Sequence, residues 1–117
     1  MDAAESFSLE EALARLDGDR DLFAELASLF LEESPKEFAA IAGALLRQDA
    51  AVLASAAHKL KGSVTQFCAA RLLESVKKLE LLGRAGDLVA AGPVCMAVET
   101  QLAELQNDLR TVQSSLS

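Results

Sequence analysis

Residues 49–68 read DAAVLASAAHKLKGSVTQFC, and the spacing of apolar side chains in this stretch decides the fold. Drawn as a helix at about 100° per residue, the stretch places its apolar side chains on one stripe. The stripe consists of Leu53, Ala56, Leu60, Val64 and Phe67. His58, the only histidine of the chain, lies about 200° around the helix from Leu60, among small side chains and Lys61. The pattern predicts a helix, capped at Gln48-Asp49, that buries its stripe and exposes the imidazole.

Composition favours helices for the rest of the chain as well. Hydrophobic residues make up 51% of the 117 residues, yet Trp and Tyr are absent and Phe occurs five times. The core must therefore be mostly aliphatic, which favours helices over sheets. A chain of this length suits one compact domain. We expect a single domain over 1–117, with a core over about 7–112 and a polar tail, 113–117, that frays.

The first half of the chain contains two helical patterns before the histidine stretch. Ser8 to Glu11 form a capping box, which predicts a short helix from about Leu9 to Leu16. A second pattern begins after Asp19, with an apolar face made of Leu22, Phe23, Leu26, Leu29 and Phe30. Ser34-Pro35 then either starts a new helix or kinks one long helix, and we favour a break or sharp kink at Ser34. Beyond it the buried face is expected to continue through Phe38, Ile41, Leu45 and Leu46.

Two further helices are expected after the histidine stretch. One runs from Ala70 to Arg84, and Asp87 caps the last, which runs to about Val112. Pro93 should bend this last helix or delay its regular part. The predicted fold class is all-α, an antiparallel four-helix bundle with a short additional N-terminal helix across one end.

Charge and motifs exclude several classes of protein. The net charge of -7 argues against nucleic-acid binding. No apolar run reaches the ~18 residues of a membrane span, and the acidic start Met1 to Glu5 shows no secretory signal. Cys68 and Cys95 are too widely spaced for a zinc motif, so we expect reduced thiols in a cytoplasmic protein and no metal site. A metal or haem bundle would need several inward ligands.

Basic residues gather between positions 59 and 84. This clustering is either a solvated helix face or a local positive patch that receives an anion. The patch would consist of Lys59, Lys61, Arg71, Lys77, Lys78 and Arg84.

The surroundings of His58 suit a phosphoryl acceptor. An exposed imidazole is mostly neutral at physiological pH and can act as a nucleophile without a separate base. Lys61, one turn away, can pair with phosphoryl oxygens. Gly62 costs about 1 kcal/mol against alanine in a helix, so it either clears space for a partner or lets two helices approach. The alternative for His58 is an exposed histidine without a role.

The stretch from Ala57 to Ser63, followed by Gln66 to Ala69, resembles the signature of histidine-containing phosphotransfer (HPt) domains of bacterial two-component phosphorelays. The resemblance extends over about residues 7–109. It implies that His58 is the phosphorylated histidine, that Lys61 lies near the phosphoryl group and that Gly62 clears the docking face. It also places Gln66 where an amide fixes local geometry. Glu80 and Arg84 match positions of a hydrogen-bond partner for the imidazole and of a basic residue.

The sequence departs from the family pattern at two positions. Cys68 stands where many members have glycine, and Lys59 stands where a small polar residue is common. Each could alter the choice of partner.

The resemblance predicts a phosphorelay intermediate. It would accept a phosphoryl group on His58 from an aspartyl phosphate of one receiver domain and pass it to another. The chain would need no cofactor, because Mg²⁺ would sit on the receiver, and would have no autokinase activity. We expect a cytoplasmic monomer. The alternatives are a phosphorylated domain detached from a chemotaxis-type or hybrid histidine kinase, and a helical adaptor that is never phosphorylated.

Overall fold

The computed structural model describes residues 6–116, and helices are the regular secondary structure that it contains over that range. The N-terminal segment Met1 to Glu5, in which no secretory signal was predicted, lies outside the described residues, as does Ser117. The helices are α1 (Leu9–Ala14), α2 (Arg20–Leu46), α3 (Ala50–Thr65), α4 (Ala70–Ala85) and α5 (Leu88–Leu116).

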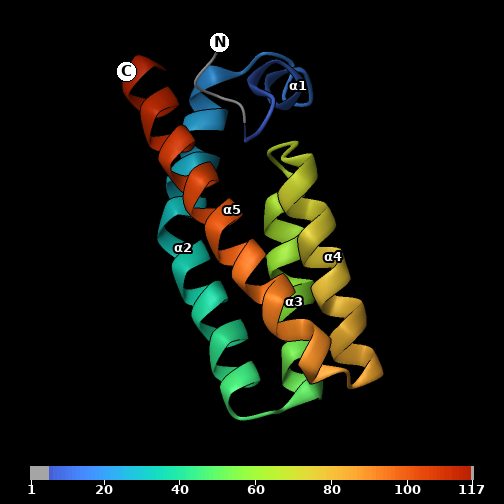
Figure 1. The fold of residues 1–117 in the computed structure, drawn as a ribbon. Coiled ribbons are helices and arrows are strands. Elements are labelled where there is room, and N and C mark those ends of the chain that lie inside the picture. Colours follow the sequence, from blue (N-terminus) through green and yellow to red (C-terminus); the bar gives the residue numbers. More distant parts are fainter. Residues whose placement is uncertain (1–5, 117) are drawn as a thin grey trace.

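The four longer helices form an antiparallel bundle, and α1 lies across one of its ends (Figure 1). Helix α3 packs against α2 and α4, and α5 closes the bundle by packing against the same two helices. The side chains between them are mostly Leu, Val and Ala, with an aromatic cluster near α1 in which Phe67 packs edge-on against Phe23 and Phe30. The predicted fold class is confirmed.

Helix α2 is continuous through Pro35, so the predicted break at Ser34 is wrong. A proline inside a helix costs about 3 kcal/mol because it lacks a backbone N–H and its ring crowds the preceding turn. Burial offsets this cost, since the buried stripe continues on both sides of Pro35. Ser34 itself is fully buried, and its hydroxyl accepts a hydrogen bond of 2.9 Å from the Gln106 amide of α5. Packing against the other helices therefore overrides the local signal.

The predicted apolar faces differ from the observed ones at a few positions. On α3, Leu53, Leu60, Val64 and Phe67 are buried as expected. Ala56 is only partly buried, and its neighbour Ala57 is fully buried instead. On α2, three leucines assigned to the apolar face are exposed, Leu22 by 38%, Leu29 by 55% and Leu46 by 86%.

Helix α5 begins at Leu88 and runs without interruption past Pro93 to Leu116, one turn beyond the predicted end. Asp87 does cap it, accepting a hydrogen bond from the Ala90 N–H at 3.1 Å. At the other end, the Gln113 amide donates to the Ala24 carbonyl and to the Ser28 hydroxyl of α2, which extends the helix into the predicted tail. Residues 88–115 are long and apolar enough to span a membrane by length and composition. Their hydropathy has a structural role here, because Val98, Leu102, Leu105 and Leu109 fill the bundle core.

Cys68 ends the connection between α3 and α4 in the left-handed backbone conformation, with φ of 55°. A side chain in this conformation costs about 1–2 kcal/mol, which glycine avoids. Glycine, which the family pattern led us to expect at this position, would avoid this cost. We expect Cys68→Gly to raise the free energy of unfolding by about 0.5–1 kcal/mol, because the loss of conformational entropy of glycine cancels part of the gain. Urea unfolding of the native chain and of Cys68→Gly measures the change in the free energy of unfolding. An unchanged or lower midpoint for the variant would contradict a backbone cost at Cys68.

Candidate functional site

His58 projects from the middle of α3, and 62% of its side chain is exposed. The local sequence explains this position. The Asp49 side chain caps the helix by accepting a hydrogen bond from the Val52 N–H at 3.1 Å. Burial of Leu53 and Leu60 then fixes the rotation of the helix about its axis, so that His58 points outward. The imidazole is therefore presented to solvent from a rigid element.

Glu80 of α4 lies directly beside the imidazole. Its side chain is only 4% exposed, and its Oε2 atom lies 2.9 Å from Nδ1 of His58. The other two contacts of the carboxylate are ion pairs: Lys61 Nζ lies 2.8 Å from Oε1, and the Arg84 guanidinium lies 2.6 Å from Oε2. A single buried carboxylate thus joins three side chains from two helices.

The surroundings of Glu80 keep its carboxylate ionised. The pKa of Glu80 is lowered to about 2, and the hydrogen bond from Lys61 is the largest cause. Burial acts in the opposite direction, and the hydrogen bond from His58 and the charges of Lys61 and Arg84 contribute to the lowering. An ionised carboxylate can only accept hydrogen bonds. Nδ1 of His58 must therefore carry the proton, which leaves the lone pair of the neutral imidazole on Nε2.

The structure brings together four of the six residues singled out from the sequence, namely His58, Lys61, Glu80 and Arg84. Gly62 is exposed on the same face, and an added Cβ there would meet nothing within 4 Å. This removes the alternative that Gly62 lets two helices approach. Gln66 lies apart from the imidazole, two turns along at the C-terminal cap of α3.

The glycine that lets two helices approach is Gly83, which the sequence reasoning missed. A Cβ atom on Gly83 of α4 would lie 2.8 Å from the backbone nitrogen of Ala54 and 3.0 Å from its Cα atom. The close contact of α3 and α4 brings Glu80 within reach of His58. A glycine inside an otherwise good helix, three residues after Glu80, was the available signal.

Charge is distributed unequally around His58. Helices α3 and α4 carry six basic and two acidic side chains, whereas α2 carries five acidic and two basic ones. Between α3 and α4, a recess of about 240 Å³ is lined by Lys61, Lys77, Glu80, Leu81 and Arg84. Lys77, which was assigned only to the general basic cluster, therefore belongs to the surroundings of Glu80. The imidazole lies between a basic and an acidic side of one surface.

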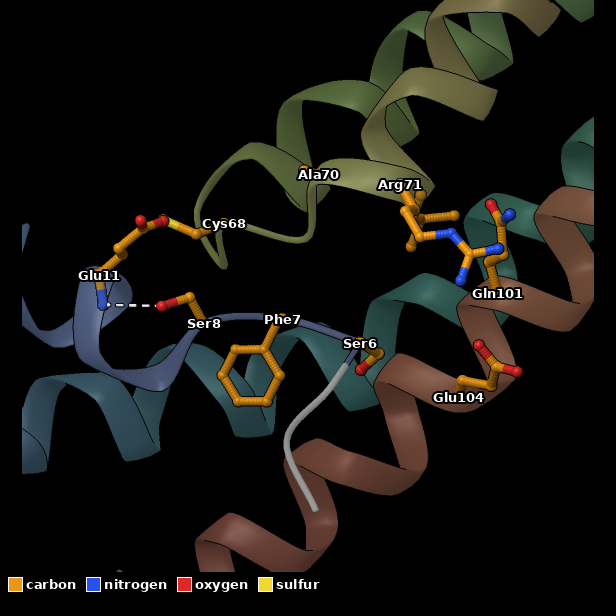
Figure 2. Close-up of a pocket in the computed structure, with 10 residues that line it drawn as sticks. Ser6, Phe7, Ser8, Glu11, Cys68, Ala70, Arg71, Gln101 and Glu104 are labelled. Atoms are coloured by element: carbon orange, nitrogen blue, oxygen red, sulfur yellow. Dashed lines mark hydrogen bonds between the residues drawn. The ribbon is translucent and has the colours of Figure 1, made fainter. Parts of the chain in front are cut away.

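A larger recess lies elsewhere, at the end of the bundle near α1 (Figure 2). Its volume is about 510 Å³, and its wall includes Cys68 and Arg71. The Arg71 side chain points toward Gln101 of α5, with the carboxylate of Glu104 one turn further along that helix (Figure 2). His58 does not line this recess.

The fold and the exposed histidine beside a buried carboxylate define a phosphotransfer domain, and comparison with known proteins agrees. The model of the Hpt domain family matches residues 25–108, and the chain belongs to this family. Its function is therefore histidine phosphotransfer within a relay, and the family works with receiver domains and is not a kinase family.

One solved structure shows the same fold. This is the crystal structure of histidine-containing phosphotransfer protein B (HptB) from Pseudomonas aeruginosa PAO1, with a TM-score of 0.87 and 22% sequence identity. The match covers 96% of this chain and 97% of that one. A search of curated protein sequences found no significant match.

The network around Glu80 predicts a pH-dependent contribution to stability. The pKa of Glu80 is about 2 in the folded chain, whereas its ordinary value, expected in the unfolded chain, is 4.5. The ionised Glu80 therefore stabilises the fold at pH values above about 4.5. This contribution is lost as the pH falls toward 2. We expect Glu80→Gln to lower the free energy of unfolding by about 1–3 kcal/mol at pH 7 and by much less near pH 2.

Urea unfolding at pH 7 and at pH 2.5 measures this difference. Glu74→Gln, which changes an exposed carboxylate on the same helix, is the matched control and should change little at either pH. An equal loss for Glu80→Gln at both pH values would show that packing, and not charge, explains the role of Glu80.

Proposed function

We propose that His58 is the phosphoryl acceptor of a relay between receiver domains. The observation that carries this proposal is the 2.9 Å contact of Nδ1 with the ionised Glu80, combined with 62% exposure of the side chain. This arrangement orients Nε2 outward with its lone pair available. The family determines the reaction class, and this geometry supports Nε2 of His58 as the acceptor atom.

In the proposed step, the Nε2 lone pair attacks the phosphorus of an aspartyl phosphate on a receiver. An N–P bond forms, the P–O bond to the aspartate breaks, and its electron pair stays on the departing carboxylate. The proton stays on Nδ1 and remains hydrogen-bonded to Glu80, whose negative charge stabilises the cationic phosphoimidazole. Transfer to the second receiver reverses these events, with its aspartate as the nucleophile.

Lys61 and Arg84 support this step electrostatically. Each side chain donates one hydrogen bond to Glu80 and has further N–H groups, which can pair with phosphoryl oxygens. Gly62 leaves room for the receiver to approach. Gln66, at the end of α3, would contact the receiver or maintain the helix end and would not orient the imidazole.

We further propose that the chain is a cytoplasmic monomer without autokinase activity. It would bind no cofactor of its own, and the receiver would hold the Mg²⁺ that assists phosphoryl transfer. The net direction of flow depends on which receivers are its partners. A domain detached from a chemotaxis-type or hybrid kinase would show the same chemistry on His58.

Transfer of label tests this proposal. The native chain is mixed with a panel of radiolabelled, phosphorylated receiver domains, and a second, unlabelled receiver is then added. We expect label to appear on the chain as an acid-labile, alkali-stable adduct and then to move to the second receiver. Incubation with labelled ATP alone should leave the chain unlabelled. If no receiver in the panel transfers label, the adaptor alternative replaces this proposal.

A further inference from the structure

Lys77 of α4 lines the recess beside Glu80 without binding the carboxylate. Two other cations of this recess, Lys61 and Arg84, form ion pairs with Glu80. Among the described residues, Lys77 has neither an ion pair nor a hydrogen bond of its side chain, and it is exposed. The contacts of the unphosphorylated chain therefore leave Lys77 without a role.

The register of α3 against α4 places Lys77 opposite Lys61. His58 of α3 contacts Glu80 of α4, and the two helices run antiparallel (Figure 1). Lys61 follows His58 by three residues and Lys77 precedes Glu80 by three, so the two lysines lie at the same level of the bundle and line one recess. Residues three apart are also neighbours on the surface of a helix, as Lys77 and Glu80 are. The carboxylate is therefore within reach of one lysine from each helix.

Phosphorylation of His58 would change the contacts of Glu80. Because Nδ1 faces Oε2 of Glu80, a phosphoryl group on Nε2 lies on the outer side of the ring. The Lys61 ammonium, which lies 2.8 Å from Oε1, must move outward to pair with the phosphoryl oxygens. Its departure would leave Oε1 without a donor on a side chain that is only 4% exposed. A buried carboxylate oxygen without a donor is costly, so a replacement cation would favour the move.

From these positions we infer that Lys77 is a positioning residue for phosphotransfer, which takes over Oε1 of Glu80 when Lys61 turns to the phosphoryl group. Glu80 then keeps a cation beside each of its oxygens, with Arg84 on Oε2, and continues to accept the hydrogen bond from Nδ1. Lys61 is released to neutralise the phosphoryl oxygens. Lys77 touches neither the phosphoryl group nor its donor and acts through Glu80. This inference rests on the proposed function, in which His58 is the acceptor.

The transfer equilibrium tests this role, because an equilibrium constant does not depend on how the receiver docks. A phosphorylated receiver domain is mixed with the chain, and the final ratio of phosphorylated chain to phosphorylated receiver is measured. Lys77→Gln is the test variant, and Lys77→Arg restores a cation. Lys78→Gln, which changes the adjacent exposed lysine outside the recess, is the matched control. Adding Lys77→Gln to Glu80→Gln completes a double-mutant cycle, which shows whether Lys77 acts through Glu80.

We expect Lys77→Gln to shift the equilibrium about 3-fold or more toward the phosphorylated receiver, since the phosphorylated chain loses an ion pair at a partly buried site. Lys77→Arg and Lys78→Gln should behave like the native chain. The urea midpoint of unphosphorylated Lys77→Gln should equal that of the native chain, because Lys61 still binds Glu80 there. In the Glu80→Gln background, Lys77→Gln should cause no further shift.

Two results would overturn the inference while leaving the proposed function intact. One is a native equilibrium for Lys77→Gln. The other is an equal shift with and without the Glu80 carboxylate, because Lys77 would then act on the phosphoryl group directly. Phosphoramidate, a small phosphoryl donor that needs no docking surface, separates the two proposals. If neither phosphoramidate nor any receiver labels the native chain, the proposed function itself fails.

Discussion

Replacing His58 with glutamine is expected to reduce phosphoryl labelling of the chain to background. Glutamine has nearly the same length as histidine but lacks a nucleophilic nitrogen, because the lone pair of an amide nitrogen is delocalised. The side chain is 62% exposed and lies outside the core, so the bundle should stay folded. Labelling from a phosphorylated receiver, followed by electrophoresis without an acid step, measures the loss.

Lys59→Gln is the matched control for this variant. It introduces the same amide one position further along α3, on an exposed side chain that makes no contact with Glu80. This control should retain most of its labelling. Native levels of label on His58→Gln would show that another residue accepts the phosphoryl group.

Gly83→Ala should destabilise the bundle more than other exchanges of one small residue for another. Its new Cβ would lie 2.8 Å from the Ala54 nitrogen and 3.0 Å from its Cα atom, and these backbone atoms cannot move without shifting α3. Overpacking of this kind costs about 1–3 kcal/mol. The shift would also move His58 away from Glu80, so phosphotransfer should slow as well. Urea unfolding and the transfer rate together measure both effects.

Gly62→Ala is the control that separates crowding from helix propensity. Both glycines lie inside helices, but the Cβ at position 62 meets nothing within 4 Å. Gly62→Ala should therefore leave the stability unchanged or raise it by up to about 1 kcal/mol. Equal effects of the two substitutions would contradict the close helix contact at Gly83.

The fold could be predicted from the sequence because its main signal is strong. Apolar residues at helical spacing identify α3, and the caps at Ser8, Asp49 and Asp87 mark helix starts that the structure also shows. The start of α2 at Arg20 likewise follows its cap, Asp19. Hydrophobic spacing and capping act locally, so they can be recognised without knowledge of the partner helices.

Predictions failed where contacts between helices decide the outcome. Pro35 looks like a helix start, but burial of Ser34 against Gln106 carries α2 through it. Leu29 has the right spacing for the core, yet it is 55% exposed and lines a groove between α2 and α3. Each of these outcomes depends on residues far away in the sequence, which a local pattern cannot register.

The candidate site, like the fold, could be predicted where a single helix determines it and not where packing between helices does. Exposure of His58 and the position of Lys61 one turn away follow from the periodicity of a single helix. The contact with Glu80 depends on the register of α4 against α3, and the resemblance to the family suggested it where spacing could not. Gly83 allows the two helices to approach closely, and only the structure reveals its contact with Ala54.

The central claim is that Glu80 holds the proton on Nδ1 and leaves Nε2 of His58 to accept the phosphoryl group. The most direct test is nuclear magnetic resonance of the ¹⁵N-histidine-labelled chain after phosphorylation, with the ³¹P–¹⁵N coupling used to identify the bonded ring nitrogen. Our account predicts phosphorus on Nε2 and a proton retained on Nδ1. Phosphorus on Nδ1, or on any residue other than His58, would contradict it.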